Sequence, residues 1–200
     1  MRIALRSSAP TLLCLTLLVA IFAGCSRAAE TNAPEAPPPP YRVDATIKDL
    51  MLAVLDGNAD TVWNSVSSVH TAQGTLETVP KTDEDWTRVR NAAITLAESA
   101  NMLMIPGRRV ARPGEKSETP GVELEPEQMD KLIAGDREGW NRHAVGLHDA
   151  AMEVVAAVEA RNPDKVFEVG ERIEIACEGC HKQYWYPNEE VSDGPVTIEK

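Results

Sequence analysis

Residues 177–181 read Cys-Glu-Gly-Cys-His, close to the end of the chain. Two cysteines separated by two residues, with a histidine directly after them, form the attachment motif of a c-type haem. On a helix, Cys177, Cys180 and His181 share one face, because residues three and four positions apart are neighbours there. Two thiols so placed can reach the two vinyl groups of one porphyrin, and the imidazole can bind its iron. The motif predicts one covalently attached haem c, with His181 as the proximal iron ligand.

Paired cysteines also serve other chemistries. A thioredoxin-like redox pair follows a strand in a βαβ unit, but residues 164–176 show no strand-like alternation. A zinc site needs further ligands, and the other two cysteines, Cys14 and Cys25, fall in the N-terminal region described next. Haem attachment is therefore favoured. A redox pair, half of a zinc site and a chance match are the alternatives.

The N-terminus has the features of a targeting segment. Arg2 and Arg6 precede an apolar run at 12–23, which is too short for a comfortable membrane span. The run ends in Phe-Ala-Gly-Cys at 22–25. This ending resembles a bacterial lipoprotein cleavage box in which Phe22 replaces the usual leucine.

A lipoprotein-type signal peptide is accordingly expected over residues 1–24, with Cys25 as the acylated first residue of the mature chain. Ser26 behind it, rather than aspartate, favours sorting to the outer membrane. The alternative is ordinary signal-peptidase cleavage after Ala28 or Ala29. Either outcome predicts a periplasmic location, and acylation adds a lipid anchor in the membrane.

The composition limits the partners. The chain has 200 residues with a formal net charge of −11, so nucleic acid is not an expected partner. Its hydrophobic content of 43% is enough for the core of one domain. The expected organisation is a Pro-rich tether over 25–42, one domain over 43–187, and a disordered acidic tail over 188–200.

Apolar residues recur at helical spacing in four stretches of that domain. The predicted helices cover 43–69 with an interruption at 56–58, then 82–103, 136–160 and 163–184. A short hairpin around Gln73-Gly74 and a short helix over 127–134 are expected between them. The pattern predicts an all-α fold, an antiparallel up-down-up-down four-helix bundle that carries one covalent haem on its last helix.

Four helices with the haem motif near the C-terminus resemble the class II c-type cytochromes, the cytochrome c-prime group. The resemblance covers about 43–184 and is most specific at 177–184, where an aromatic residue three positions after the haem histidine recurs in the family. Trp140 and residues 46–51 are weaker matches. The resemblance implies a single-haem bundle, and family members are often homodimers. A peroxidase or other haem enzyme is not expected, because the sequence offers no distal acid/base pair.

The resemblance also implies how the second face of the iron is used. In the low-spin branch a methionine of the first helix binds there, whereas in the c-prime branch an apolar side chain blocks an open site. Met51 falls at this position, so the resemblance implies Met51 as the distal ligand; packing in the core is the alternative. Ile47 stands where c-prime proteins have arginine, with Lys48 the nearest cation. Met129 and His143 rank lower.

These observations predict a monohaem c-type cytochrome that transfers single electrons between redox partner proteins of the bacterial cell envelope. A His/Met ligand pair suits such a carrier because it raises the reduction potential. The alternative is a five-coordinate, c-prime-type haem protein that binds nitric oxide or another small gas.

Overall fold

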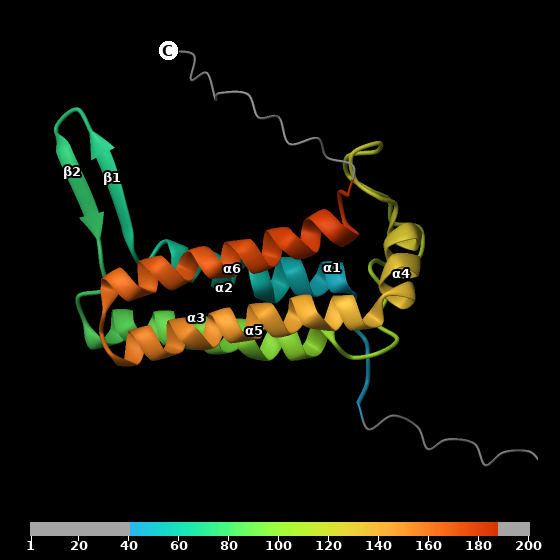
Figure 1. Ribbon diagram of the computed structural model, residues 1–200, viewed down its shortest axis with the longest axis horizontal. Helices are drawn as coiled ribbons and strands as arrows, with labels where there is room; N and C mark the ends of the chain where they lie inside the picture. The colour runs from blue at the N-terminus through green and yellow to red at the C-terminus, as the bar shows by residue number, and fades with distance from the viewer. Residues whose placement is uncertain (1–40, 188–200) are drawn as a thin grey trace, which may run out of the picture. The chain divides into compact units, whose positions relative to one another are not determined.

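The computed structural model describes residues 41–187, which are mostly helical with one two-stranded sheet (Figure 1). The predicted signal peptide, Cys25, nearly all of the predicted tether and the predicted tail lie outside these residues. The elements in chain order are α1 (Ile47–Leu50), the π-helical segment η1 (Met51–Leu55), α2 (Asp56–Trp63), β1 (Ser67–Thr71), β2 (Gly74–Thr78), α3 (Asp83–Leu103), α4 (Pro126–Gly135), α5 (Arg137–Glu159) and α6 (Pro163–Tyr184).

The first helical stretch differs from the prediction at its start and at the predicted interruption. It begins at Ile47 rather than near Val43, because Thr46 caps it: the Thr46 hydroxyl accepts from the Asp49 amide at 3.0 Å, and the Asp49 carboxylate accepts from the Thr46 amide at 3.0 Å. The predicted interruption at 56–58 is wrong. The chain remains helical there, with one π-helical turn just before it.

The end of this stretch is also different. The predicted helix to Val69 is wrong, since α2 ends at Trp63 and Val69 lies in β1 opposite Leu76 of β2. The hairpin predicted around Gln73-Gly74 is confirmed and is longer than expected. Gly74 has a φ of 128°, a conformation that favours glycine. Val and Thr suit the strands, and both strands are almost wholly exposed.

The three long helices are confirmed within one residue of the predicted ends. Each has a side-chain cap at its N-terminus, from Thr82, Asp136 and Asn162 respectively. The apolar stripes of α3 and α5 are buried as expected. Their buried members are Trp86, Val89, Ala93, Leu96, Ala100, Leu103, Trp140, Ala144, Leu147, Ala151, Val154 and Val158.

Helix α5 packs against both α3 and α6, and α2 packs against α3 and α6. In Figure 1, α3, α5 and α6 follow one another in alternating directions, and the end of α6 comes back to the side where α1 begins. Helix α4 lies at this same end and contacts α5 and α6. The last turns of α6, which carry the cysteine motif, are therefore surrounded by α1, η1, α4 and the start of α5.

The segment between α3 and α4 closes one side of this end. Its carbonyl groups at Arg109 and Val110 accept the amides of Ile47 and Lys48, at 2.9 and 3.0 Å, so it is bound to the first turn of α1. Further along, the Leu124 amide donates to the Trp185 carbonyl at 2.8 Å, just after α6. The segment thus joins the two elements that carry the predicted iron ligands.

Candidate functional site

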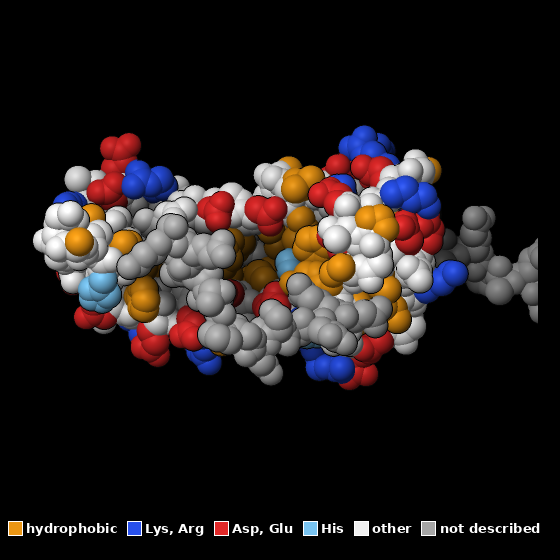
Figure 2. Space-filling model, turned by 90° about the horizontal axis from the view of Figure 1, so that it is seen from above, with side chains coloured by type: hydrophobic (Ala, Val, Ile, Leu, Met, Phe, Trp, Pro, Cys, Tyr) orange, Lys and Arg blue, Asp and Glu red, His pale blue; other side chains and the backbone are white. Residues whose placement is uncertain are grey.

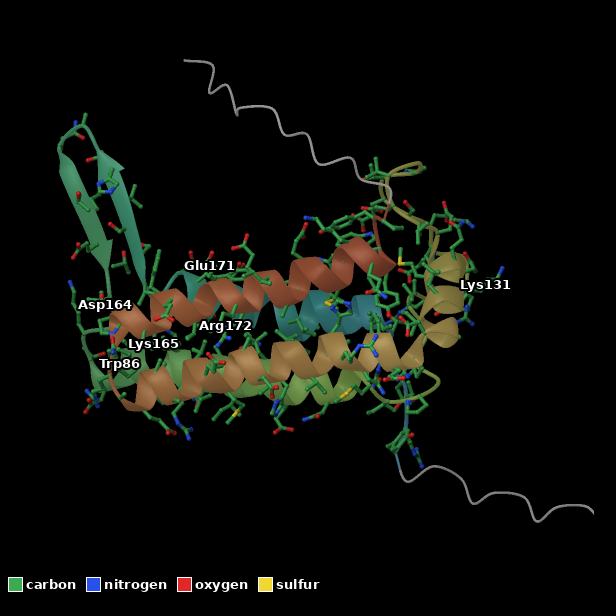
Figure 3. All side chains as sticks on the ribbon, in the orientation of Figure 1. Trp86, Lys131, Asp164, Lys165, Glu171 and Arg172 are labelled. Atoms are coloured by element: carbon green, nitrogen blue, oxygen red, sulfur yellow. The ribbon has the colours of Figure 1, made fainter. Side chains whose placement is uncertain are left out.

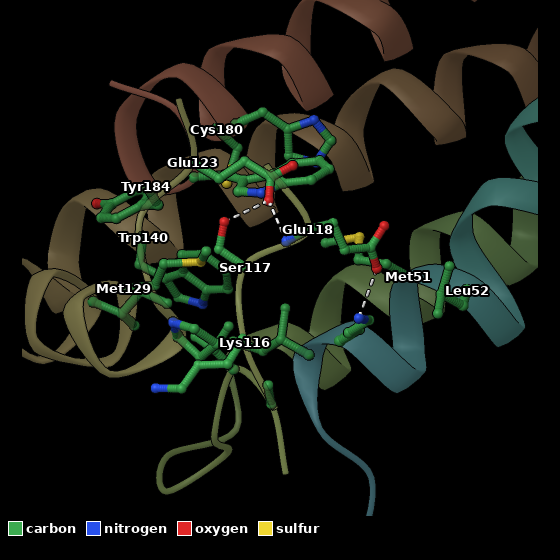
Figure 4. Close-up of a pocket in the computed structure, with 18 of the residues that line it drawn as sticks. Met51, Leu52, Lys116, Ser117, Glu118, Glu123, Met129, Trp140, Cys180 and Tyr184 are labelled. Carbon is green, nitrogen blue, oxygen red and sulfur yellow. Dashed lines mark hydrogen bonds and ion pairs between the residues drawn. The ribbon is translucent and has the colours of Figure 1, made fainter. Parts of the chain in front are cut away.

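Two adjoining cavities lie between α6 and the α1–η1–α2 stretch, with volumes of about 220 and 180 Å³. Figure 4 shows the first of them, with Met51 on one wall and Cys180 on the other. Both cavities are lined by Met51, Asp56, Cys180 and His181. The remaining walls are largely apolar; in the first cavity they include Ile47, Leu52, Val110, Ala111, Met129, Ile133, Trp140 and Tyr184.

The structure therefore brings together residues that the sequence alone could only place on separate helices. Cys177 lines the second cavity, and Cys180 and His181 line both. Met51 reaches the same walls from η1, on the other side of the space. Largely apolar walls beside two thiols of one helix are the surroundings that a covalently attached porphyrin would require. Binding of iron by Met51 and His181 stays a prediction.

The two thiols are in a setting that keeps them protonated. Burial raises the pKa of Cys180 to about 12 and that of Cys177 to about 11, with the Asp56 carboxylate adding to the effect on Cys177. A thioredoxin-like pair needs the opposite, a thiol whose pKa is lowered so that it attacks as a thiolate. This environment disfavours the redox-pair alternative.

His181 is half-buried among aromatic rings. Its ring centroid lies 4.9 Å from that of Trp185, edge to face, and 5.9 Å from that of Tyr186. Burial lowers the pKa of His181, while the carboxylates of Glu178 and Asp56 oppose this change. Within residues 41–187 no hydrogen bond engages either ring nitrogen. A neutral imidazole with a free nitrogen is the form that binds a metal.

No three His, Cys, Asp or Glu side chains between residues 41 and 187 are grouped so that they could hold a metal ion. Haem iron does not require such a group, because the porphyrin supplies four ligands and the protein adds one side chain on a face.

Two residues that the sequence ranked low take part in the site. Met129 lies on α4, which confirms the short helix predicted over 127–134; it is buried and lines the first cavity. The sequence signal for the start of this helix is Pro126 in the first turn, with Glu125 and Gln128 forming a reciprocal cap. His143 lines the second cavity, and a Cβ atom added at Gly179 would lie 3.6 Å from its Cε1 atom.

Charged groups stand at the mouth of the first cavity. Lys48 Nζ lies 2.8 Å from a Glu118 carboxylate oxygen, and Lys116 also lines the opening. Burial acts to raise the pKa of Glu123, but hydrogen bonds from Thr119 and its neighbours hold that pKa below its usual value. Lys48 and Lys116 are the two cations that line the first cavity, and Ile47 contributes only apolar wall.

No helix of the described part of the chain is long and apolar enough to cross a membrane. Comparisons with protein-family models, with curated proteins and with solved structures each gave no match.

Proposed function

We propose that this protein is a monohaem c-type cytochrome that transfers single electrons between redox partner proteins of the bacterial cell envelope. The observation that supports the proposal is that Met51, Cys180 and His181, from opposite ends of the described chain, line the same two cavities. In this proposal the α1–η1–α2 stretch, α3, α5 and α6 constitute the up-down-up-down bundle of the class II cytochromes.

Each residue has a defined task. Cys177 and Cys180 would hold the haem through thioethers, and His181 and Met51 would bind its iron. Bound haem supplies an iron that changes by one electron between two oxidation states, and a His/Met pair raises its potential. The apolar walls exclude water, and Lys48 and Lys116 stand where the acidic edge of the haem would meet solvent.

The proposed location follows from the N-terminal segment of the sequence. Cleavage after residue 24 and acylation of Cys25 would hold the protein at the outer membrane, facing the periplasm, with residues 25–42 as the tether. Partner proteins of the envelope would donate and accept the electron. No catalytic role is proposed.

A visible spectrum of the full chain, expressed in a host with a haem-attachment system, tests the ligand pair. We expect a low-spin spectrum in both oxidation states. Met51→Ala should give a high-spin protein that binds carbon monoxide, because the second face of the iron loses its ligand. Met129→Ala is the matched control: it removes the other cavity thioether and should leave the spin state unchanged.

Two outcomes would contradict the assignment. If Met129→Ala rather than Met51→Ala changes the spin state, the ligand is Met129. If the unaltered protein is already high-spin and binds carbon monoxide, the gas-binding alternative is correct. A mass spectrum of the mature chain completes the test. It should show covalent haem, absent from Cys177→Ser with Cys180→Ser, and a lipid on Cys25.

A further inference from the structure

A third cavity lies on the outer side of the molecule, between α2 and α6 near the base of the hairpin. Its volume is about 540 Å³, the largest of the three. Its floor is apolar, with the buried side chains of Val62 and Val66. The Trp63 Nε1–H group donates to the Gly170 carbonyl at 3.0 Å across the floor, so the polar groups there are paired. We call this space the α2–α6 groove.

The rim of the groove exposes large apolar side chains. Phe167 lines it and is 62% exposed, and Ile175 is 64% exposed two turns further along α6. Residues at this spacing share a helix face, and Glu171 and Glu174 stand between them on that face. Exposed aromatic and aliphatic side chains beside an apolar hollow are typical of surfaces that bind another molecule.

The charges around the groove are all of one sign. Glu171 and Glu174 line it, and neither forms an ion pair within the described residues. Figure 3 shows Glu171 projecting from α6 on the side away from α5, whereas Arg172 lies toward α5, where it pairs with Glu153. Arg172, the cation next to Glu171 in the sequence, therefore does not neutralise the groove.

The groove leads to the haem-attachment motif. Trp63 lines both the groove and the second site cavity, which also contains Cys177. Asp56 and Asp60 line that cavity from α2, and they too form no ion pair within residues 41–187. In Figure 2 the hollows on this face hold hydrophobic side chains, with carboxylates at their edges.

We propose that the α2–α6 groove docks a basic segment of a partner protein that also carries apolar side chains. Lysine or arginine would meet Glu171 and Glu174, and an apolar side chain would fill the hollow beside Phe167 and Trp63. The redox role of this partner rests on the proposed function, since docking here would bring it beside Cys177 and the haem edge. The binding itself depends only on the shape and charge of the groove.

Other occupants match the groove less well. A second copy of this chain carries the same net charge of −11, so the pairing would bring carboxylates together. The C-terminal segment 188–200 has four acidic residues and one lysine, which gives it the same sign as the groove. A cationic partner is the occupant that the charges favour.

An amphipathic Leu/Lys peptide is a suitable probe of the full, haem-loaded chain, with the corresponding Leu/Glu peptide as a negative control. Titration calorimetry at low ionic strength should detect binding of the first peptide only. Glu171→Gln with Glu174→Gln should weaken binding roughly fivefold, as expected for two exposed charge pairs. Phe167→Ser should also weaken it. Glu84→Gln with Glu98→Gln on α3 removes the same charge from another face and should leave binding unchanged.

The proposal is wrong if the α3 pair weakens binding as much as the α6 pair, because attraction would then be a property of the whole charge. It is also wrong if Phe167→Ser dissociates a dimer in sedimentation experiments, or if removal of residues 188–200 is needed before the peptide binds. Those results would assign the groove to a second copy or to the tail. Peptide binding requires no electron transfer, so this proposal and the proposed function can fail separately.

Discussion

Two helix contacts in this molecule are formed by similar apolar stripes but differ in packing. One is the contact of α3 with α5, and the other is that of α6 with the α1–η1–α2 stretch. Where α3 meets α5, small side chains fill the contact: Ala93, Ala97, Ala100, Ala144 and Ala151 are all buried. Where α6 faces the α1–η1–α2 stretch, the three cavities described above open between the helices. We call α3 with α5 the closed pair and α6 with the α1–η1–α2 stretch the open pair. Buried side chains of the closed pair also border the second cavity, at Leu96, Leu103, Ala144 and Leu147.

The difference lies in a few positions of α6. Val166, Val169 and Ile173 are fully buried like any core residue, but Gly170, Cys177 and Cys180 occupy positions of the same stripe. The Trp63 ring packs against Gly170, whereas the thiols of Cys177 and Cys180 line the site cavities. A close-packed interior tolerates few such voids, and here the three cavities lie beside α6.

The largest expected effect tests whether the proposed haem fills the space between α6 and the α1–η1–α2 stretch. In Cys177→Ser with Cys180→Ser, amides of α6, η1 and α2 should exchange with solvent far faster than in the haem-loaded protein, while those of α3 and α5 change little. Loss of the cofactor leaves the cavities empty, and local opening follows where few buried contacts remain. Hydrogen exchange with mass spectrometry measures this. Equal acceleration in all helices would show that the two pairs do not differ.

An intermediate effect tests the closed pair. Ala151→Leu adds a large side chain where α5 has no exposed surface, and should lower the free energy of unfolding by about 1–3 kcal/mol. Ala156→Leu on the exposed side of the same helix is the control, with a change within about 0.5 kcal/mol. Urea unfolding followed by circular dichroism provides both values. A tolerated Ala151→Leu would mean that space exists between α3 and α5 as well.

The smallest expected effect concerns Asp136, which connects the two pairs. Its carboxylate accepts from the Gly139 amide at 2.9 Å and from Tyr184 and Gln183 of α6. The hydrogen bond from Gly139, followed by that from Tyr184, holds the pKa of Asp136 below its usual value of 3.8. On acidification, the Asp136 carboxylate of the unfolded chain is therefore protonated at a higher pH than that of the folded chain. The stabilisation is complete above that value and is lost as the pH falls through the lower pKa of the folded state.

Asp136→Asn keeps an amide oxygen as a cap but removes the titration. The loss of stability on acidification below pH 3.8 should be smaller in this variant, as measured by thermal unfolding across an acid series. Glu98→Gln controls for removal of an exposed carboxylate. If the acid dependence of Asp136→Asn equals that of the unaltered chain, Asp136 does not link α5 to α6 through its charge.

The sequence predicted the three long helices well. Each of α3, α5 and α6 combines a long stripe of period 3.6 with a polar cap at its start, so periodicity and capping give the same answer. Cys177, Cys180 and His181, which the sequence places on one face of α6, all line the site cavities. Local signals sufficed because these helices are regular.

The arrangement of the α1–η1–α2 stretch against α6 was predicted less well, because it depends on contacts between residues distant in sequence. Val66 and Val69 continue the helical spacing of α2, yet Ser67–Thr71 also suits a strand, and pairing with Gly74–Thr78 decides between them. Whether Met51 and His181 border one space depends on how α1 is bound by the 104–125 segment, a contact between residues distant in sequence. The α2–α6 groove depends likewise on the position of α2 against α6.

The π-helical turn at Met51–Leu55 has a consequence for variation of the chain length. Such a turn contains one residue more than an α-helical turn, because its hydrogen bonds span five residues instead of four. Because the extra residue is accommodated within one turn, deletion of a single residue from this segment would restore an ordinary helix and leave α1 and α2 in nearly the same orientation. The hydrogen bonds of Ile47 and Lys48 to the 104–125 segment could then be kept. Only the side chains within the turn, which include the Met51 side chain that lines both site cavities, would change direction. A one-codon deletion would therefore alter this cavity wall and leave the rest of the fold as it is.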